Sequence, residues 1–188
     1  MSGPAVAIFG SSRTEPGSPE WIEAEKAGTR CAGAGLAVIT GGYGGTMEAV
    51  SKGAALAGGR VIGVTAAELF RDRSGANTYV TEEIPSKTLT DRIGILTELA
   101  SGAIALPGSI GTAAELVVAW NMHHIARLSG GSRKPTAAVG NGWRQVSLLF
   151  ADGIGAFMGD IEWVDTADQA VDWLLQQPEI HASRRATV

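Results

Sequence analysis

Short apolar runs alternate with amphipathic stretches along most of this 188-residue chain. Apolar runs that end in glycine or polar residues predict buried strands at residues 5–9, 36–40, 60–65, 79–84, 103–106, 135–139 and 161–164. Apolar positions at helical spacing predict helices at residues 19–34, 46–57, 87–101, 112 to the turn at 130–132, 143–150 and 166–177. This alternation predicts an α/β fold with a doubly wound parallel sheet flanked by helices on both faces.

The domain organisation follows from the length of the chain, which is enough for one domain with one core. We predict a single domain over residues 1–178 and a disordered tail over residues 179–188, since chain ends are often frayed. Residues 66–77 lack a clean period, so a short helix and a mobile loop are expected there.

Composition and charge limit the kinds of partner. The net charge of −4 argues against a nucleic-acid partner, because the phosphate backbone recruits clustered Lys and Arg. Cys31 is the one cysteine, which excludes an internal disulfide and favours a reducing compartment. The N-terminus has no secretory pattern, and no apolar run approaches the roughly 20 residues of a membrane helix. We therefore expect a cytoplasmic protein without a membrane partner.

Three loops follow predicted strands and are expected at the carboxyl edge of the sheet, where such sheets bind ligands. Two of them open a helix with Gly-Thr, which points backbone N–H groups and the positive helix end at a bound phosphate. Positive-φ turn geometry is the alternative explanation of these glycines. The pattern is neither the dinucleotide fingerprint nor a P-loop. The candidate phosphate- or nucleotide-binding residues are Gly10, Ser11, Ser12, Gly41, Gly42, Gly45, Thr46, Pro107, Gly108, Ser109, Gly111 and Thr112.

Two acidic residues and one arginine are candidates for chemistry. Glu115 is expected in the first turn of its helix, although its spacing from Thr112 also matches a capping box. Glu48 has the same two interpretations and is a possible second acid for cleavage of a glycosidic bond. Arg92 follows Asp91, so a surface ion pair is the alternative to a place in the site. His123 and His124 lie next to each other on a helix without further ligands at suitable spacing, so no metal site is predicted.

The stretch from Pro107 to Glu115, PGSIGTAAE, resembles the PGGxGTxxE signature of the Lonely Guy (LOG) proteins. The stretch TGGYGGTME, from Thr40 to Glu48, is similar to their GGGxxGxMG motif, and Arg92 stands fifteen residues before Pro107, where the family has its Arg. The resemblance implies a Rossmann-like fold, usually dimeric. It also implies hydrolysis of AMP or a cytokinin riboside monophosphate to free base and ribose 5-phosphate, without metal or organic cofactor.

Carried over by position, the resemblance implies that Arg92 and Glu115 are the catalytic pair and that Gly108, Gly111 and Thr112 bind the phosphate. The chain departs from the family pattern at several positions, and Ile93 replaces a Lys that follows the family's Arg. A second hypothesis is therefore a non-catalytic protein that binds or carries a nucleotide or phosphorylated cofactor.

Family members are often labelled lysine decarboxylases, but the residues of this chain do not support that activity. Pyridoxal phosphate enzymes need a Schiff-base Lys with an acidic partner for the ring nitrogen. Neither Lys52 nor Lys87 stands in such a setting.

Overall fold

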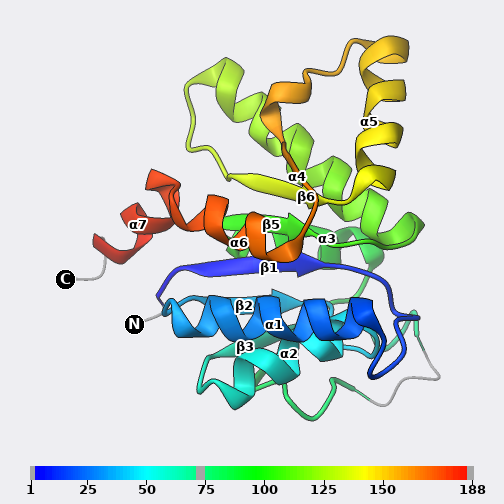
Figure 1. The fold of residues 1–188 in the computed structure, drawn as a ribbon, viewed down its shortest axis with the longest axis vertical. Helices are drawn as coiled ribbons and strands as arrows, with labels where there is room; N and C mark the ends of the chain where they lie inside the picture. Colours follow the sequence, from blue (N-terminus) through cyan, green and yellow to red (C-terminus); the bar gives the residue numbers. More distant parts are fainter. Residues whose placement is uncertain (1–2, 71–74, 186–188) are drawn as a thin grey trace.

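The computed structural model describes residues 3–70 and 75–185, in which seven parallel strands form one sheet with the order β4-β3-β2-β1-β5-β6-β7 (Figure 1). The strands are β1 (Ala5–Phe9), β2 (Ala37–Thr40), β3 (Val61–Thr65), β4 (Glu82–Pro85), β5 (Gly102–Ala105), β6 (Thr136–Val139) and β7 (Glu162–Val164). The helices are α1 (Pro19–Gly33), α2 (Thr46–Leu56), α3 (Leu89–Leu99), α4 (Ile110–Ser129), α5 (Asn141–Ile154), α6 (Ala167–Leu175), α7 (Pro178–Arg185) and the 3₁₀ turn η1 (Met158–Asp160). The predicted fold class is confirmed.

Each face of the sheet carries its own hydrophobic core. Val6 and Ile8 of β1 point to one face, where they pack with residues of α1, α2 and α6. Ala7 and Phe9 point to the other face, where α3, α4 and part of α5 cover the sheet. Because both faces are covered, the central strands are apolar throughout, and this explains the continuous apolar runs in the sequence.

The order of the strands creates a ligand crevice beside β1. From β1 the chain builds β2, β3 and β4 outward on one side, then returns to place β5 on the other side of β1. In a sheet of this kind, the loops at such a topological switch point diverge and leave room for a ligand at the carboxyl edge. The loops after β1, β2 and β5 are the three glycine loops predicted at this edge.

Most element boundaries agree with the sequence prediction to within a few residues, and two helix starts agree in detail. Ser18 caps α1 by accepting a hydrogen bond from the Trp21 amide at 3.2 Å. Thr166 caps α6 in a capping box with Gln169. The predicted short helix and mobile loop fall partly on residues 71–74, which lie outside the described residues.

The prediction of a disordered tail is wrong for the residues up to Arg185, because residues 178–185 form α7. Ile180 anchors this helix, since its side chain is fully buried in the core beside Leu174. Gly102 of β5 makes room for both side chains. A Cβ on this glycine would lie 2.9 Å from Leu174 Cδ1 and 3.0 Å from Ile180 Cδ1.

Candidate functional site

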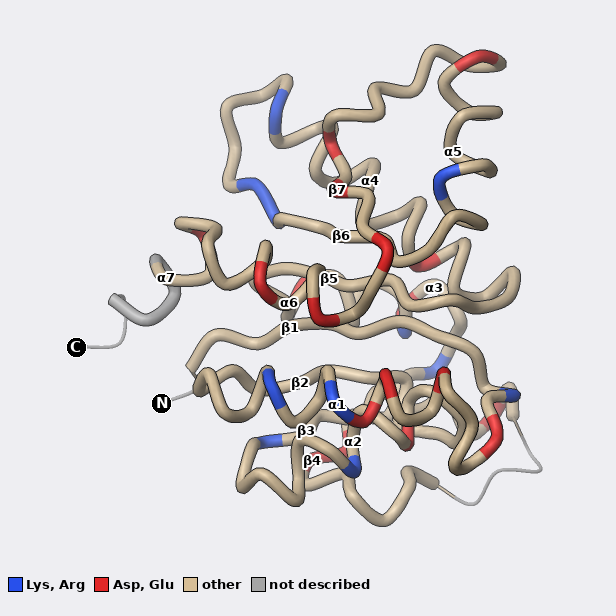
Figure 2. Tube along the Cα trace, viewed as in Figure 1, with Lys and Arg blue, Asp and Glu red and all other residues tan. Residues whose placement is uncertain are grey.

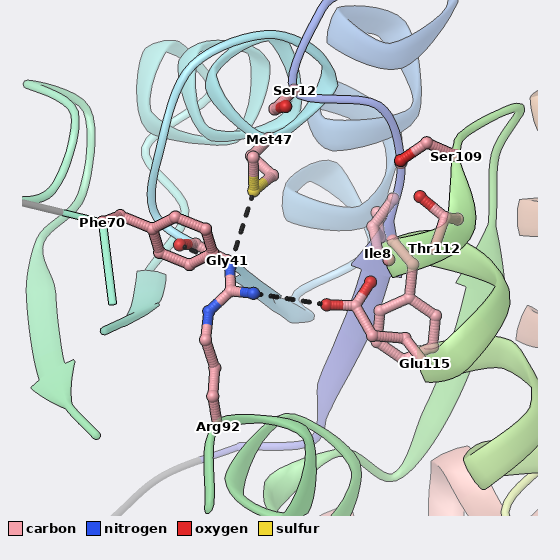
Figure 3. A pocket seen from close by; sticks show the side chains of 12 residues that line it. Ile8, Ser12, Gly41, Met47, Phe70, Arg92, Ser109, Thr112 and Glu115 are labelled. Carbon is pink, nitrogen blue, oxygen red and sulfur yellow. Dashed lines mark hydrogen bonds and ion pairs between the residues drawn. The ribbon is translucent and has the colours of Figure 1, made fainter. Parts of the chain in front are cut away.

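A cavity of about 180 Å³ opens at the switch point, between the carboxyl ends of β1 and β2 and the start of α4 (Figure 3). Its walls come from segments far apart in the chain. The lining residues are Ile8, Phe9, Gly10, Ser12, Gly41, Met47, Phe70, Arg92, Ser109, Gly111, Thr112 and Glu115. The structure thus brings together Arg92, Glu115 and residues from all three glycine loops.

Arg92 reaches the cavity from the second turn of α3 and is only 7% exposed. Its Nε donates a hydrogen bond to the Val64 carbonyl at 2.8 Å, and its Nη2 donates one to the Gly41 carbonyl at 2.9 Å. These carbonyls belong to β3 and to the loop after β2, so the sheet edge itself holds the guanidinium. The surface ion pair with Asp91 is excluded as the main role of Arg92, because Asp91 is exposed whereas Arg92 is buried.

Glu115 faces Arg92 across the cavity, with Oε1 3.6 Å from Arg92 Nη1 (Figure 3). The capping-box interpretation is wrong, because α4 begins at Ile110 with Ser109 as its N-cap. Glu115 therefore lies in the second turn rather than the first, too far along the helix to fold back onto the cap. Burial raises the pKa of Glu115 to about 7, although the positive charge of Arg92 lowers it in part.

The N-terminus of α4 faces the same cavity through Ser109, Gly111 and Thr112. Within the described chain no side chain caps this end, and the first intrahelical bond after the cap is from the Ala113 amide to the Ser109 carbonyl at 2.9 Å. The amides of the preceding first turn therefore lack an intrahelical acceptor. With the dipole of a 20-residue helix behind them, these amides form a potential anion site.

Pro107 and Gly108 stand behind this helix start and line a neighbouring cavity instead. Gly108 is needed for close packing, because a Cβ there would lie 2.5 Å from Thr112 Cβ. This glycine lets the loop fold over the Thr112 side chain, which is 2% exposed.

The first two glycine loops contribute in different ways. Gly10 and Gly41 line the cavity, and a side chain on Gly41 would meet Met47 Sδ at 2.6 Å as well as the Arg92 guanidinium. Gly42 and Gly45 have φ values of +75° and +71°, so the turn explanation applies to them.

Ser11, Thr46 and Glu48 are not among the residues that line the cavity. The Thr46 amide donates a hydrogen bond to the Ser11 carbonyl at 2.8 Å, which joins the first two loops to each other. Glu48 is half-buried in the first turn of α2. Ser11 and Thr46 therefore support the site by joining its loops, and none of the three residues stands in the wall of the cavity.

Sequence reasoning missed Met47 and Phe70, both of which line the cavity. Met47 lies within the second motif, TGGYGGTME, so that motif could have pointed to it. Phe70 stands after β3 without any periodic pattern around it, so only the position of the β3 carboxyl end could have pointed to it.

The two histidines of α4 have structural partners. His124 Nδ1 lies 3.0 Å from Oδ2 of the buried Asp160, whose Oδ1 also accepts a 2.7 Å hydrogen bond from Arg127 Nε. His123 Nδ1 lies 3.1 Å from the Lys134 carbonyl. Among the described residues, no group of three or more acidic, His or Cys side chains is arranged to hold a metal ion.

The fold and the cavity define an α/β protein of the doubly wound class with a switch-point site. A family model described as the SLOG cluster4 family matches residues 4–141, and the chain belongs to this family. A comparison with curated proteins gives no match.

Solved structures that resemble this chain show the same fold. The molybdenum cofactor binding protein from Rippkaea orientalis has a TM-score of 0.74 at 20% identity, with 93% of this chain and 97% of that chain covered. The molybdenum cofactor carrier protein from Chlamydomonas reinhardtii has a TM-score of 0.70 at 22% identity, with 93% and 97% covered. DNA processing protein A from Helicobacter pylori has a TM-score of 0.59 at 14% identity, with 93% and 81% covered.

Within the part of the chain that the structure describes, no helix combines the length and the apolar character that a bilayer crossing requires.

Proposed function

We propose that this protein hydrolyses the N-glycosidic bond of a nucleoside 5′-monophosphate, AMP or a cytokinin riboside monophosphate, to give free base and ribose 5-phosphate. The observation that carries the proposal is the placement of the Glu115 carboxylate beside Arg92 in a cavity that the uncapped start of α4 also lines. An anion site and a buried acid–base group in one small cavity are the elements that this reaction requires.

The amides of the first turn of α4 hold the 5′-phosphate in this mechanism, because they supply unpaired donors and the positive helix end. The ribose then lies over Glu115, whose ionised carboxylate stabilises the oxocarbenium-like transition state. The same carboxylate accepts a proton from the attacking water as the water oxygen bonds to the anomeric carbon of the ribose. The base departs with the electron pair of the glycosidic bond and takes up a proton from solvent, to which Glu115 returns the proton that it accepted. Arg92 binds the nucleotide and keeps Glu115 partly ionised at neutral pH.

The direct test is incubation of the purified protein with AMP and with isopentenyladenosine monophosphate, followed by chromatography for free base and ribose 5-phosphate. Glu115→Gln keeps the size of the side chain, removes its charge, and is expected to lower turnover at least about 100-fold. Glu48→Gln is the matched control, because Glu48 is a half-buried acid in the first turn of the other loop helix.

A small loss in Glu48→Gln would leave Glu115 as the principal acid, whereas a large loss would assign Glu48 the role of second acid. Release of base that is equal in the wild type and Glu115→Gln would contradict the proposal.

A non-catalytic nucleotide or phosphorylated-cofactor carrier is the second candidate function. It is favoured by Ile93, which is buried where the LOG pattern has a cation, and by the fold shared with two proteins described as binding or carrying the molybdenum cofactor. This candidate predicts that nucleotides or phosphorylated cofactors raise the thermal unfolding temperature without any turnover. If no ligand in a panel of this kind raises the unfolding temperature, the carrier function is excluded.

The proposed partner is a small phosphate ester rather than nucleic acid. Figure 2 shows Lys and Arg interspersed with Asp and Glu along the trace of the described chain. DNA processing protein A shares the fold and is described as binding single-stranded DNA, so a gel-shift assay with single-stranded DNA is the appropriate test. We also propose a homodimer or a higher homo-oligomer, as the LOG resemblance implies, and light scattering after size-exclusion chromatography tests this.

A further inference from the structure

The side of the cavity away from α4 carries an aromatic ring. Phe70 lines the cavity and is half-buried, and Figure 3 shows it on one side of the Arg92 guanidinium with Ser109 and Thr112 beyond Glu115 on the other. The Arg92 guanidinium lies over the Phe70 ring, with its central carbon 5.9 Å from the ring centroid. Ile8 and Phe9 line the cavity as well. The cavity thus has backbone donors at the helix start and the Phe70 ring on the side away from that helix.

The position of Phe70 is fixed by its surroundings. Its ring meets the ring of Tyr43 edge to face, with centroids 5.5 Å apart and an interplanar angle of 74°. Tyr43 is 3% exposed, and its hydroxyl accepts a hydrogen bond from the Ala66 amide at 2.7 Å. The Phe70 amide in turn bonds to the Ala66 carbonyl at 3.1 Å. The buried Tyr43 and the backbone of Ala66 therefore hold the Phe70 ring in place at the cavity.

The size of the cavity limits how much of a ligand it encloses. Pockets that enclose a whole drug-sized molecule measure about 300–1,000 Å³, whereas this cavity measures about 180 Å³. A nucleotide with its phosphate at α4 and its ribose at Glu115 therefore extends its base away from α4, toward the side of the cavity that carries Phe70. An aromatic side chain on that side offers a flat apolar surface, which a heterocycle uses and a sugar phosphate does not.

We propose that Phe70 determines specificity by stacking on the heterocyclic ring of the ligand, so that the site selects nucleotides over simple sugar phosphates. This inference rests on the proposed function for the position of the phosphate and extends it to the residue that recognises the base. Stacking on an aromatic side chain tolerates any base, because each base has a π-face, and the larger purine ring makes the larger contact.

The test compares the affinities of AMP, CMP and ribose 5-phosphate by calorimetry, in a Glu115→Gln background so that no ligand is consumed. Phe70→Leu is expected to weaken AMP binding about 10-fold or more, CMP binding less, and ribose 5-phosphate binding less than about twofold. Phe70→Trp is expected to keep the AMP affinity. The neighbouring Leu69, which is 49% exposed and does not line the cavity, gives the matched control Leu69→Ala.

The possible outcomes separate this inference from the proposed function. Equal weakening of all three ligands in Phe70→Leu would make Phe70 a structural residue, and no weakening of AMP would place the base elsewhere. Either result overturns the inference. Selective loss of AMP binding, together with an absence of turnover in the wild type, would support the inference and overturn hydrolysis alone. Failure of AMP and ribose 5-phosphate to bind the otherwise unchanged Glu115→Gln protein would overturn both.

Discussion

Arg92 Nη1 and Glu115 Oε1 lie 3.6 Å apart, although they belong to different helices and are 23 residues apart in the chain. This distance makes an ion pair but is longer than a good hydrogen bond. By contrast, Arg127 Nε of α4 donates a 2.7 Å hydrogen bond to Asp160 Oδ1 of η1. The looser pair at the cavity leaves the Glu115 carboxylate able to accept hydrogen bonds from a ligand or water.

The raised pKa of Glu115 predicts a specific dependence of stability on pH. Because its pKa is about 7 in the folded protein and ordinarily 4.5, the folded state binds more protons between these values. Its contribution to the unfolding free energy is fully present below pH 4.5 and is lost as the pH rises through 7. We expect the wild type to lose up to about 3 kcal/mol relative to Glu115→Gln over this range.

Urea unfolding of both proteins at pH 4.5, 6 and 8 measures this difference. If the difference in unfolding free energy between the wild type and Glu115→Gln stays constant with pH, burial does not raise the pKa of Glu115.

The same pKa predicts the pH dependence of turnover. If the ionised carboxylate acts on the ribose, kcat/KM rises with pH and levels off above about 7, since this parameter reports the free enzyme. Initial rates of base release from AMP between pH 5 and 9 measure the profile. A rate that falls as the pH rises through 7 would instead assign Glu115 the role of general acid.

Gly111 provides a test that separates folding from binding. It lies in the first turn of α4 and lines the cavity, and apart from its chain neighbours and the nearby backbone of its own helix an added Cβ would meet no described atom within 4 Å. We expect Gly111→Ala to raise the unfolding free energy by about 0.5–1 kcal/mol, because alanine is the better helix residue. The same methyl group would obstruct the amides, so AMP should bind more weakly in a calorimetric titration.

Gly108→Ala is the contrasting variant in the same loop. Its Cβ would collide with the Thr112 side chain, so the unfolding free energy should fall by about 1–3 kcal/mol. If Gly111→Ala binds AMP as well as the wild type does, the helix start is not the phosphate site.

Arg92 is expected to be more important for stability at high pH than at low pH. Arg92→Met removes the hydrogen bonds to the Val64 and Gly41 carbonyls, and above pH 7 it also leaves the buried Glu115 carboxylate without its charged partner. We predict a loss of about 2–4 kcal/mol at pH 8 and a smaller loss at pH 5. Unfolding of Arg92→Met, Glu115→Gln and the double variant at both pH values gives the coupling energy, which should be larger at pH 8.

Asp160, which bonds to Arg127 and His124 near the C-terminal end of α4, is expected to give the opposite dependence of stability on pH. Burial raises its pKa, but the hydrogen bonds from Arg127 and His124 outweigh that effect and hold the pKa below 3.8. Its contribution to stability is therefore present above pH 3.8 and is lost as the pH falls through the lowered pKa. Asp160→Asn should lower the unfolding free energy by about 2 kcal/mol at pH 7 and by less at pH 3. Equal losses at both pH values would contradict this.

The sequence by itself determined the alternation of strands and helices, the parallel sheet with two covered faces, and the glycine loops at its carboxyl edge. These features depend on local patterns, such as continuous apolar runs, the caps at Ser18 and Thr166, and the helical period of 3.6 residues. Such patterns are read from neighbouring residues, so they need no knowledge of distant contacts.

Tertiary structure alone decided the start of α4 at Ile110, the approach of Arg92 to Glu115 and the position of Phe70. Capping preference predicted a helix start at Thr112, but α4 begins two residues earlier, and the Thr112 side chain packs against Gly108 instead of capping the helix. Arg92 enters the cavity because carbonyls of β3 and of the loop after β2 accept its hydrogen bonds. Those acceptors are distant in the chain and become neighbours only when the sheet forms, which is why no local pattern could reveal them.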